Sequence, residues 1–114
     1  MIIHWYYNLD PTPIPDKSGF IEVERIYCFD WDRFQKQNWQ DLTSIYSTLP
    51  GALSENEQSW FGDNESQPPF LWASVEPPGL QVYGVLPLSD WQKWDREFLA
   101  RIGPLPMRDI SAGD

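Results

Sequence analysis

Residues 70–86 have the sequence FLWASVEPPGLQVYGVL. Two runs rich in β-branched and aromatic residues, 70–76 and 80–86, flank the turn sequence Pro77-Pro78-Gly79. This pattern is typical of a β-hairpin and predicts two antiparallel strands. An antiparallel sheet can be covered by helices on one face and leave the other face open. The hairpin therefore predicts a sheet of this kind, and the rest of the chain has to supply its further strands and its helices.

Two further strands are predicted before the hairpin. Residues 2–9 are mostly β-branched and aromatic, which favours a strand. Residues 10–16 contain three prolines and therefore form an extended loop rather than a regular element. Residues 20–29 alternate imperfectly between apolar and polar side chains, which predicts a second strand with Glu22 and Glu24 on the same face.

Two amphipathic helices are predicted on the same grounds. Asp30 stands at an N-cap position, and the apolar residues that follow recur at helical spacing to about residue 48, where Pro50-Gly51 ends the pattern. Ser89 begins a capping-box pattern, and apolar residues at helical spacing predict a final helix over 88–102.

The segment between the first helix and the hairpin carries a further helical signal. Ser54 is followed three residues later by Glu57, which is a capping-box pattern. It predicts a short helical insert near 55–61 that ends at Gly62.

Together these elements predict an α+β fold in the order ββα, insert, ββα. We expect a four-stranded, mainly antiparallel sheet with two helices packed on one face. Residues 1–106 are predicted to form a single domain, because a chain of 114 residues is long enough to bury one core. The tail 107–114 has little to bury and is expected to be frayed.

The composition restricts the classes of partner and the compartment. Eight basic and 17 acidic residues give a net charge of −9, which disfavours nucleic acids and anionic membranes and favours a basic protein partner. No signal-peptide pattern and no window of about 18 apolar residues is present, so we expect a cytoplasmic protein. The acidity could equally serve only to keep an aromatic-rich surface soluble.

The sequence contains no catalytic or metal-binding motif. His4 and Cys28 are the only histidine and cysteine, which is too few for a zinc site, and Cys28 is expected to be a buried, inert thiol. The acidic segment from Asp63 lacks the glycine and the closing glutamate of a calcium-binding loop. No glycine-rich phosphate loop occurs. We therefore predict no catalytic residue, no cofactor and no metal ion.

Aromatic residues are the strongest functional signal in this chain. Seven tryptophans, six phenylalanines and five tyrosines are more bulky rings than so small a domain can bury, and half-exposed rings often mark interfaces. Carboxylates next to such rings suit a cationic partner, because ring faces attract cations. The predicted patch comprises Trp39, Trp60 and Phe61 with Glu55, Glu57, Asp63 and Glu65. The alternative interpretation is that Trp60 and Phe61 fold back and close one end of the core.

Three functions fit these features. The first is a small acidic protein-binding module, a non-enzymatic accessory or assembly factor that docks through an aromatic patch rimmed by carboxylates. The second is an immunity-type protein that neutralises a basic, nuclease-like toxin, by analogy of size and charge. The third is an enzyme that acts on a small ligand with carboxylates. Self-association through the open sheet face is an alternative use of the aromatic residues.

Overall fold

The computed structural model describes residues 6–8, 16–53 and 56–108, which form an antiparallel sheet and two α-helices. The predicted α+β class is therefore confirmed. The six strands lie in the order β1-β2-β6-β5-β4-β3. Their bounds are β1 (Tyr6–Asn8), β2 (Phe20–Tyr27), β3 (Ala52–Leu53), β4 (Asn56–Trp60), β5 (Phe70–Glu76) and β6 (Gly79–Pro87). The helices are a short 3-10 turn, η1 (Trp31–Arg33), and two α-helices, α1 (Lys36–Thr48) and α2 (Leu88–Arg101).

The predicted hairpin forms the centre of the sheet. β5 and β6 pair from Phe70↔Val85 to Glu76↔Gly79, and β2 pairs with the other side of β6 along its whole length. Gly79 closes the turn with a φ of +150°, and a Cβ at this position would collide with the carbonyl oxygen of Tyr27 on β2. Only glycine fits here, because it has no side chain and tolerates positive φ.

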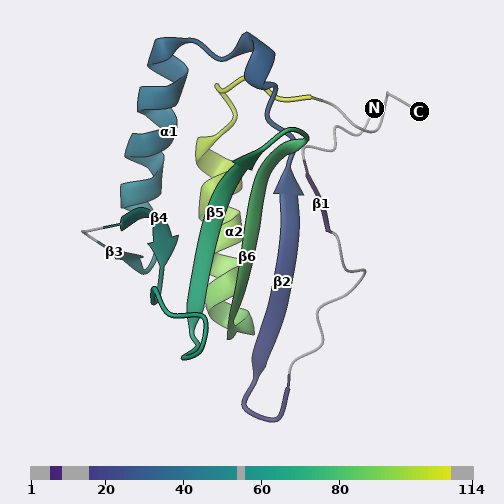
Figure 1. Cartoon of the computed structure of the whole chain (residues 1–114), viewed down its shortest axis with the longest axis vertical. Helices are drawn as coiled ribbons and strands as arrows, with labels where there is room; N and C mark the ends of the chain where they lie inside the picture. Colours follow the sequence, from purple (N-terminus) through teal and green to yellow (C-terminus); the bar gives the residue numbers. More distant parts are fainter. Residues whose placement is uncertain (1–5, 9–15, 54–55, 109–114) are drawn as a thin grey trace.

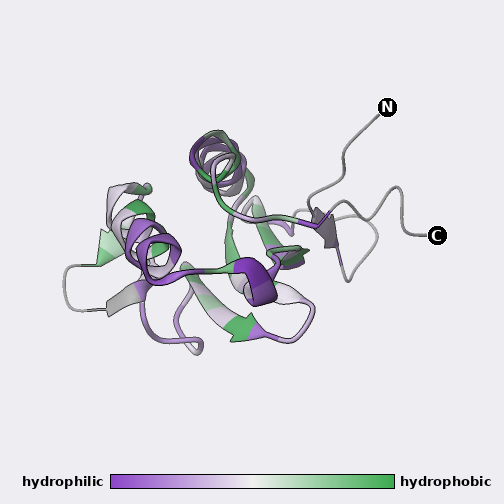
Figure 2. Cartoon of the chain, turned by 90° about the horizontal axis from the view of Figure 1, so that it is seen from above, coloured by the Kyte–Doolittle hydropathy of each residue, from purple (hydrophilic) through white to green (hydrophobic). Residues whose placement is uncertain are grey.

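One face of the sheet is covered by both helices. α2 runs behind β5 and β6 in Figure 1, and α1 lies beside it toward β3 and β4 (Figure 2). A single buried cluster joins the two helices to the inward side chains of the strands. It includes Ile21, Val23 and Tyr27 of β2, Leu71 and Ala73 of β5, Leu80, Val82 and Leu86 of β6, Leu42 and Tyr46 of α1, and Trp91, Trp94 and Phe98 of α2.

The predicted four-stranded sheet is wrong, because β3 and β4 extend it to six strands. The helical insert predicted near 55–61 is strand β4, which pairs with β3 on one side and β5 on the other. Pairing with Leu71 places Trp60 in the core, where it is 0% exposed. Burying a tryptophan stabilises the fold by more than a capping-box pattern does, so the tertiary contact overrides the local signal. The element order is ββα followed by ββββα, and the predicted repeat of a ββα unit is not observed.

The first predicted helix is interrupted near its start. η1 is followed by Phe34, which has extended backbone angles (φ −69°, ψ 133°), and α1 begins only at Lys36. The Gln35 backbone N–H donates to the Asn38 side chain at 2.7 Å as part of a capping box, so the N-cap of α1 is Gln35, whereas Asp30 precedes η1. The second helix begins at Leu88 after Pro87, and the side chain of Ser89 does not cap it.

The two ends of the chain are described in part. β1 falls inside the strand predicted over 2–9, and the remainder of that range lies outside the described residues. The segment predicted as a frayed tail begins with Met107, which forms a β-bridge with Phe29. The Arg108 backbone N–H donates to the Cys28 carbonyl oxygen at 2.8 Å. Residues 109–114 lie outside the described part. No helix in the described residues is long and apolar enough to cross a membrane.

Candidate functional site: an aromatic and acidic sheet face

The sheet face opposite the helices carries the candidate site. No helix lies in front of β2, β6 and β5 in the view of Figure 1. Side chains alternate between the two faces of a strand, so the residues between the core positions point to this side. We call this surface the open face and define it by its exposed and half-buried residues: Glu22 and Glu24 of β2, Trp72, Ser74 and Glu76 of β5, and Gln81, Tyr83 and Val85 of β6.

Two aromatic rings occupy the middle of the open face. The strand register places Glu24, Tyr83 and Trp72 side by side in one row across β2, β6 and β5. The ring centroids of Trp72 and Tyr83 lie 5.5 Å apart, at an interplanar angle of 45°. The Trp72 indole N–H donates to Glu65 Oε1 at 2.9 Å, and the Tyr83 hydroxyl donates to Glu22 Oε2 at 2.7 Å. Both polar ring atoms are thus bound by carboxylates, which fix the orientation of the rings.

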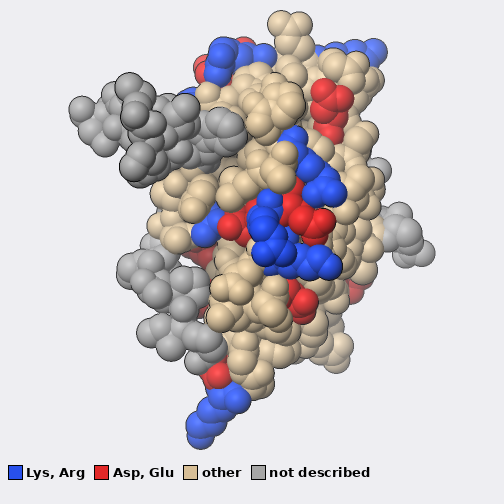
Figure 3. All heavy atoms as spheres, turned by 180° about the vertical axis from the view of Figure 1, so that it is seen from behind, with Lys and Arg blue, Asp and Glu red and all other residues tan. Residues whose placement is uncertain are grey.

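The charge of the open face is uniformly negative. The pKa of Tyr83 is raised to about 12, first by its hydrogen bond to Glu22, then by partial burial, and then by the charges of Glu22, Glu65 and Glu24. Three carboxylates therefore act on one phenol. No lysine or arginine belongs to the open face, and the ion pairs seen among the described residues use other acidic side chains. Figure 3 shows lysine and arginine side chains gathered on the opposite, helix-covered side.

Trp60 does not lie on an exposed patch, contrary to the sequence analysis. It is fully buried, its indole N–H donates to the Tyr46 carbonyl oxygen at 3.0 Å, and its ring packs edge-on against Tyr46 and Trp94. Phe61 is half-buried against the core, and its ring fills the space next to Gly51. The alternative interpretation, in which this pair closes one end of the core, describes the structure better. Trp60 is therefore not accessible to a partner.

The other predicted patch residues are distributed over different places. Glu65 is brought to the open face by its hydrogen bond to Trp72. Asp63 is exposed in the loop that precedes β5. Glu57 belongs to β4, and Glu55 lies outside the described residues. Glu65 is thus the predicted carboxylate that a described contact places at the open face.

Trp39 is exposed, as expected, but it belongs to α1 and not to the open face. The residue is 40% exposed, and its ring stacks on Trp31 at a centroid distance of 5.1 Å and an angle of 10°. Phe34 packs against both of these rings. A recess of about 360 Å³ next to Trp31 is lined by Phe29, Asp30, Trp31, Asp32, Pro77 and Arg108. This recess carries charges of both signs, unlike the open face.

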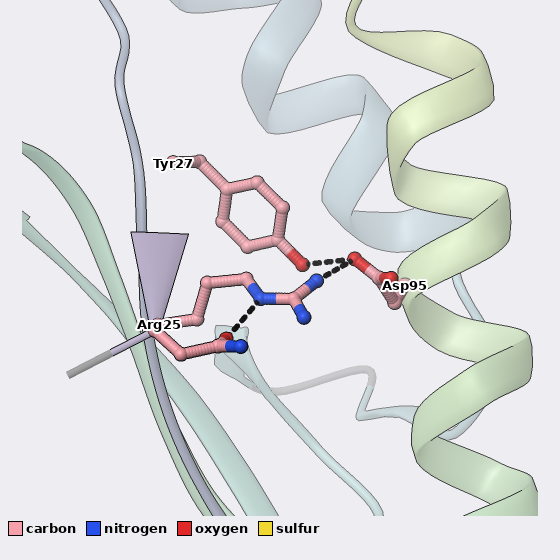
Figure 4. Close-up of polar contacts among 4 residues, drawn as sticks. Arg25, Tyr27 and Asp95 are labelled. Carbon is pink, nitrogen blue, oxygen red and sulfur yellow. Dashed lines mark hydrogen bonds and ion pairs between the residues drawn. The ribbon is translucent and has the colours of Figure 1, made fainter. Parts of the chain in front are cut away.

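A buried polar network joins β2 to α2 on the core side. Figure 4 shows Arg25 and Tyr27 pointing at Asp95 of α2. Asp95 Oδ1 accepts hydrogen bonds from Arg25 Nη1 at 2.5 Å and from the Tyr27 hydroxyl at 2.6 Å. The Arg25 guanidinium also lies 4.0 Å above the Tyr6 ring and donates to Asn8 Oδ1. Burial raises the pKa of Tyr27 well above its usual value, so it stays protonated and acts as a structural donor.

The residues considered for metal or thiol chemistry form no site in the described part of the chain. Cys28 is fully buried, and this burial raises the pKa of its thiol, which keeps it protonated and unreactive. His4 lies outside the described residues. No group of three or more metal-ligating side chains occurs within the described ranges.

The two central residues of the open face, Trp72 and Tyr83, were not predicted as site residues, although both of their strands were predicted. The signal that finds them is the alternation within the hairpin. If Leu71 and Val82 point to the core, then Trp72 and Tyr83 point to the open face together with Glu22 and Glu24. This assignment needs the pairing of β2 with β6, which sequence alternation alone does not give.

Comparison with known proteins identifies no relative. No family model, curated protein or solved structure matches the chain. Its function therefore has to be inferred from the chemistry and geometry of its own surface.

Proposed function

We propose that this chain is a small, non-enzymatic protein-binding module that binds a basic protein partner through the open face. The observation that carries this proposal is the Trp72–Tyr83 pair, which is held between Glu22 and Glu65 on a face without lysine or arginine. This site replaces the patch around residues 55–65 that the sequence analysis predicted.

The chemistry of these residues suits a cationic partner. Tryptophan and tyrosine supply most of the binding energy in many interfaces, because they bury a large area at a low cost in conformational entropy. A guanidinium or ammonium group over such a ring gains about 0.5–2 kcal/mol, depending on how far it is desolvated. The surrounding carboxylates and the net charge of −9 would attract a basic protein and raise its association rate.

Two alternatives share part of this argument. An immunity-type function, in which the chain covers the basic surface of a toxin, would use the same face and the same charges. Its association rate should then fall steeply with salt, whereas an assembly contact dominated by the rings should lose little affinity. Symmetric self-association through the open face is disfavoured, because it would bring Glu22, Glu24 and Glu65 close to their copies.

The test is affinity capture from a lysate of the source cell with three variants. The wild-type chain and Lys93→Ala, a control on the exposed side of α2, should capture the same basic protein. Trp72→Ala and the charge reversal Glu24→Lys should lose it while they keep the wild-type circular dichroism spectrum. Equal capture by all four proteins, or capture of an acidic protein only, would contradict the proposal.

A further inference from the structure

Both polar hydrogens of the ring pair on the open face are already bound. The Trp72 indole N–H donates to Glu65 Oε1, and the Tyr83 hydroxyl donates to Glu22 Oε2. A carboxylate accepts more than one hydrogen bond, so Glu22 and Glu65 can still accept others. The ring pair therefore presents two ring faces to a partner, with carboxylate oxygens beside them.

Glu24 adds a third carboxylate in line with the rings. It stands in one row with Tyr83 and Trp72 across β2, β6 and β5, where adjacent strands lie about 4.8 Å apart. No hydrogen bond or ion pair of the Glu24 side chain is seen within the described ranges. The row therefore ends in a carboxylate whose oxygens are available to a donor from a partner.

The chain itself shows how a guanidinium is held by such groups. The Arg25 Cζ atom lies 4.0 Å from the ring centroid of Tyr6 and 4.8 Å from that of Trp91. The Arg25 Nη1 atom donates to Asp95 Oδ1 at 2.5 Å. One tyrosine, one tryptophan and one carboxylate thus hold an arginine on the helix-covered side of the sheet. The row on the open face offers the same three groups to an arginine from outside.

Arginine suits this combination of groups better than lysine does. The guanidinium is planar, so it can stack on a ring while its N–H groups reach carboxylates at the edge of that ring. The ammonium group of lysine is a compact charge that is more strongly hydrated, so it loses more when it is pressed against rings. Ring faces next to carboxylate acceptors therefore favour a planar cation that has several donors and no acceptor.

We infer that the partner binds the open face through an arginine side chain, whose guanidinium stacks on the Trp72 and Tyr83 rings and donates hydrogen bonds to Glu24. This inference rests on the proposed function, which gives the basic partner and the face that it binds. It adds which basic side chain is recognised and where its charged group lies. A basic protein that presents only lysine to this face should therefore bind more weakly.

The test uses three blocked pentapeptides that differ only in their central residue, which is arginine, lysine or citrulline. Lysine at both ends and glycine between give all three the same basic background, and citrulline keeps the shape of arginine without its charge. Each peptide is titrated into the ¹⁵N-labelled full chain, and the resonances of residues 72 and 83 report binding. We expect a dissociation constant of about 1 mM or less for the arginine peptide, at least about threefold higher for lysine and about tenfold higher for citrulline.

Two variants test the position of the guanidinium. Glu24→Gln and Trp72→Leu should each bring the dissociation constants of the arginine and lysine peptides to within about a factor of two. Asp41→Asn is the matched control, because it removes a carboxylate charge from an exposed position on α1, and it should keep the preference for arginine. The ¹H–¹⁵N spectrum of each variant checks that the fold is retained.

The outcomes separate this inference from the proposed function. If the arginine and lysine peptides bind equally and shift residues 72 and 83, the arginine contact is overturned and the open face remains the docking surface. If the arginine peptide does not bind, or if its preference persists in both variants, the arginine contact is also overturned, and lysate capture decides the proposed function independently. Shifts confined to α1 and α2 would contradict both. A preference that both variants abolish and Asp41→Asn keeps supports the inference.

Discussion

Replacing Asp95 by alanine should destabilise the protein by about 3 kcal/mol. Asp95 accepts hydrogen bonds from both Arg25 and Tyr27, and the Arg25 side chain is only 9% exposed. Removing one partner of a buried ion pair leaves a charge without compensation and costs about 3–5 kcal/mol. We expect the lower end of this range, because Arg25 keeps Asn8 and the Tyr6 ring as partners and Asp95 is itself 19% exposed.

This loss is large compared with the total stability of a small domain, about 5–15 kcal/mol. Urea unfolding followed by circular dichroism should show it as a shift of the midpoint with an unchanged slope. Glu97→Ala is the matched control, because its pair with Arg101 is longer, with an N···O distance of 3.7 Å, and more exposed, with side-chain exposures of 37% for Arg101 and 30% for Glu97; its loss should cost less than about 1 kcal/mol.

A double variant isolates the cause. Arg25→Met combined with Asp95→Leu removes both charges and should recover most of the stability, because a buried ion pair can often be replaced by apolar residues of similar volume. A loss below about 1 kcal/mol in Asp95→Ala would refute the reasoning. A double variant that is less stable than Asp95→Ala would also refute this reasoning.

Three further predictions concern the core, the open face and the hairpin turn. Trp60→Ala should cost about 3–5 kcal/mol in urea unfolding, because it removes a fully buried ring, and a loss below about 1 kcal/mol would contradict this packing. Tyr83 should ionise near pH 12 in a spectrophotometric titration compared with Tyr83→Phe, and Glu22→Gln should lower this pKa toward 10. Because the folded pKa is raised, the associated stability is complete below about pH 10 and is lost as the pH rises toward 12; an unshifted phenol would show that the hydrogen bond is absent. Gly79→Ala should lower the melting temperature, because the added Cβ collides with a carbonyl oxygen of β2, and an unchanged melting temperature would contradict this turn geometry.

The regular elements with strong patterns could be predicted from the sequence. The 70–86 hairpin and the final helix have continuous alternation or helical spacing between clear turn signals, and both are observed. β4 was missed because its local signal is helical, while its conformation is set by pairing with β5 and by the burial of Trp60. Such long-range contacts leave no trace in a short window of sequence.

The candidate site was predictable in its chemistry but not in its place. The combination of aromatic rings and carboxylates is present on the open face, as the composition suggests. Its residues come from three strands and a loop, so Glu22, Glu65, Trp72 and Tyr83 meet only after the order β2-β6-β5 is known. Of the predicted patch, Glu65 contacts this group of residues, whereas Trp39 stacks on Trp31.

Site-specific photo-crosslinking in the source cell tests the open face most directly. A photoreactive residue at position 81 lies on the open face, and the same residue at position 92 lies on the exposed side of α2. The proposed function predicts that a basic protein crosslinks from position 81 and not from position 92, and that Trp72→Ala abolishes the crosslink. Crosslinking from position 92 alone, or with equal yield from both positions, would contradict the assignment of the open face as the binding surface.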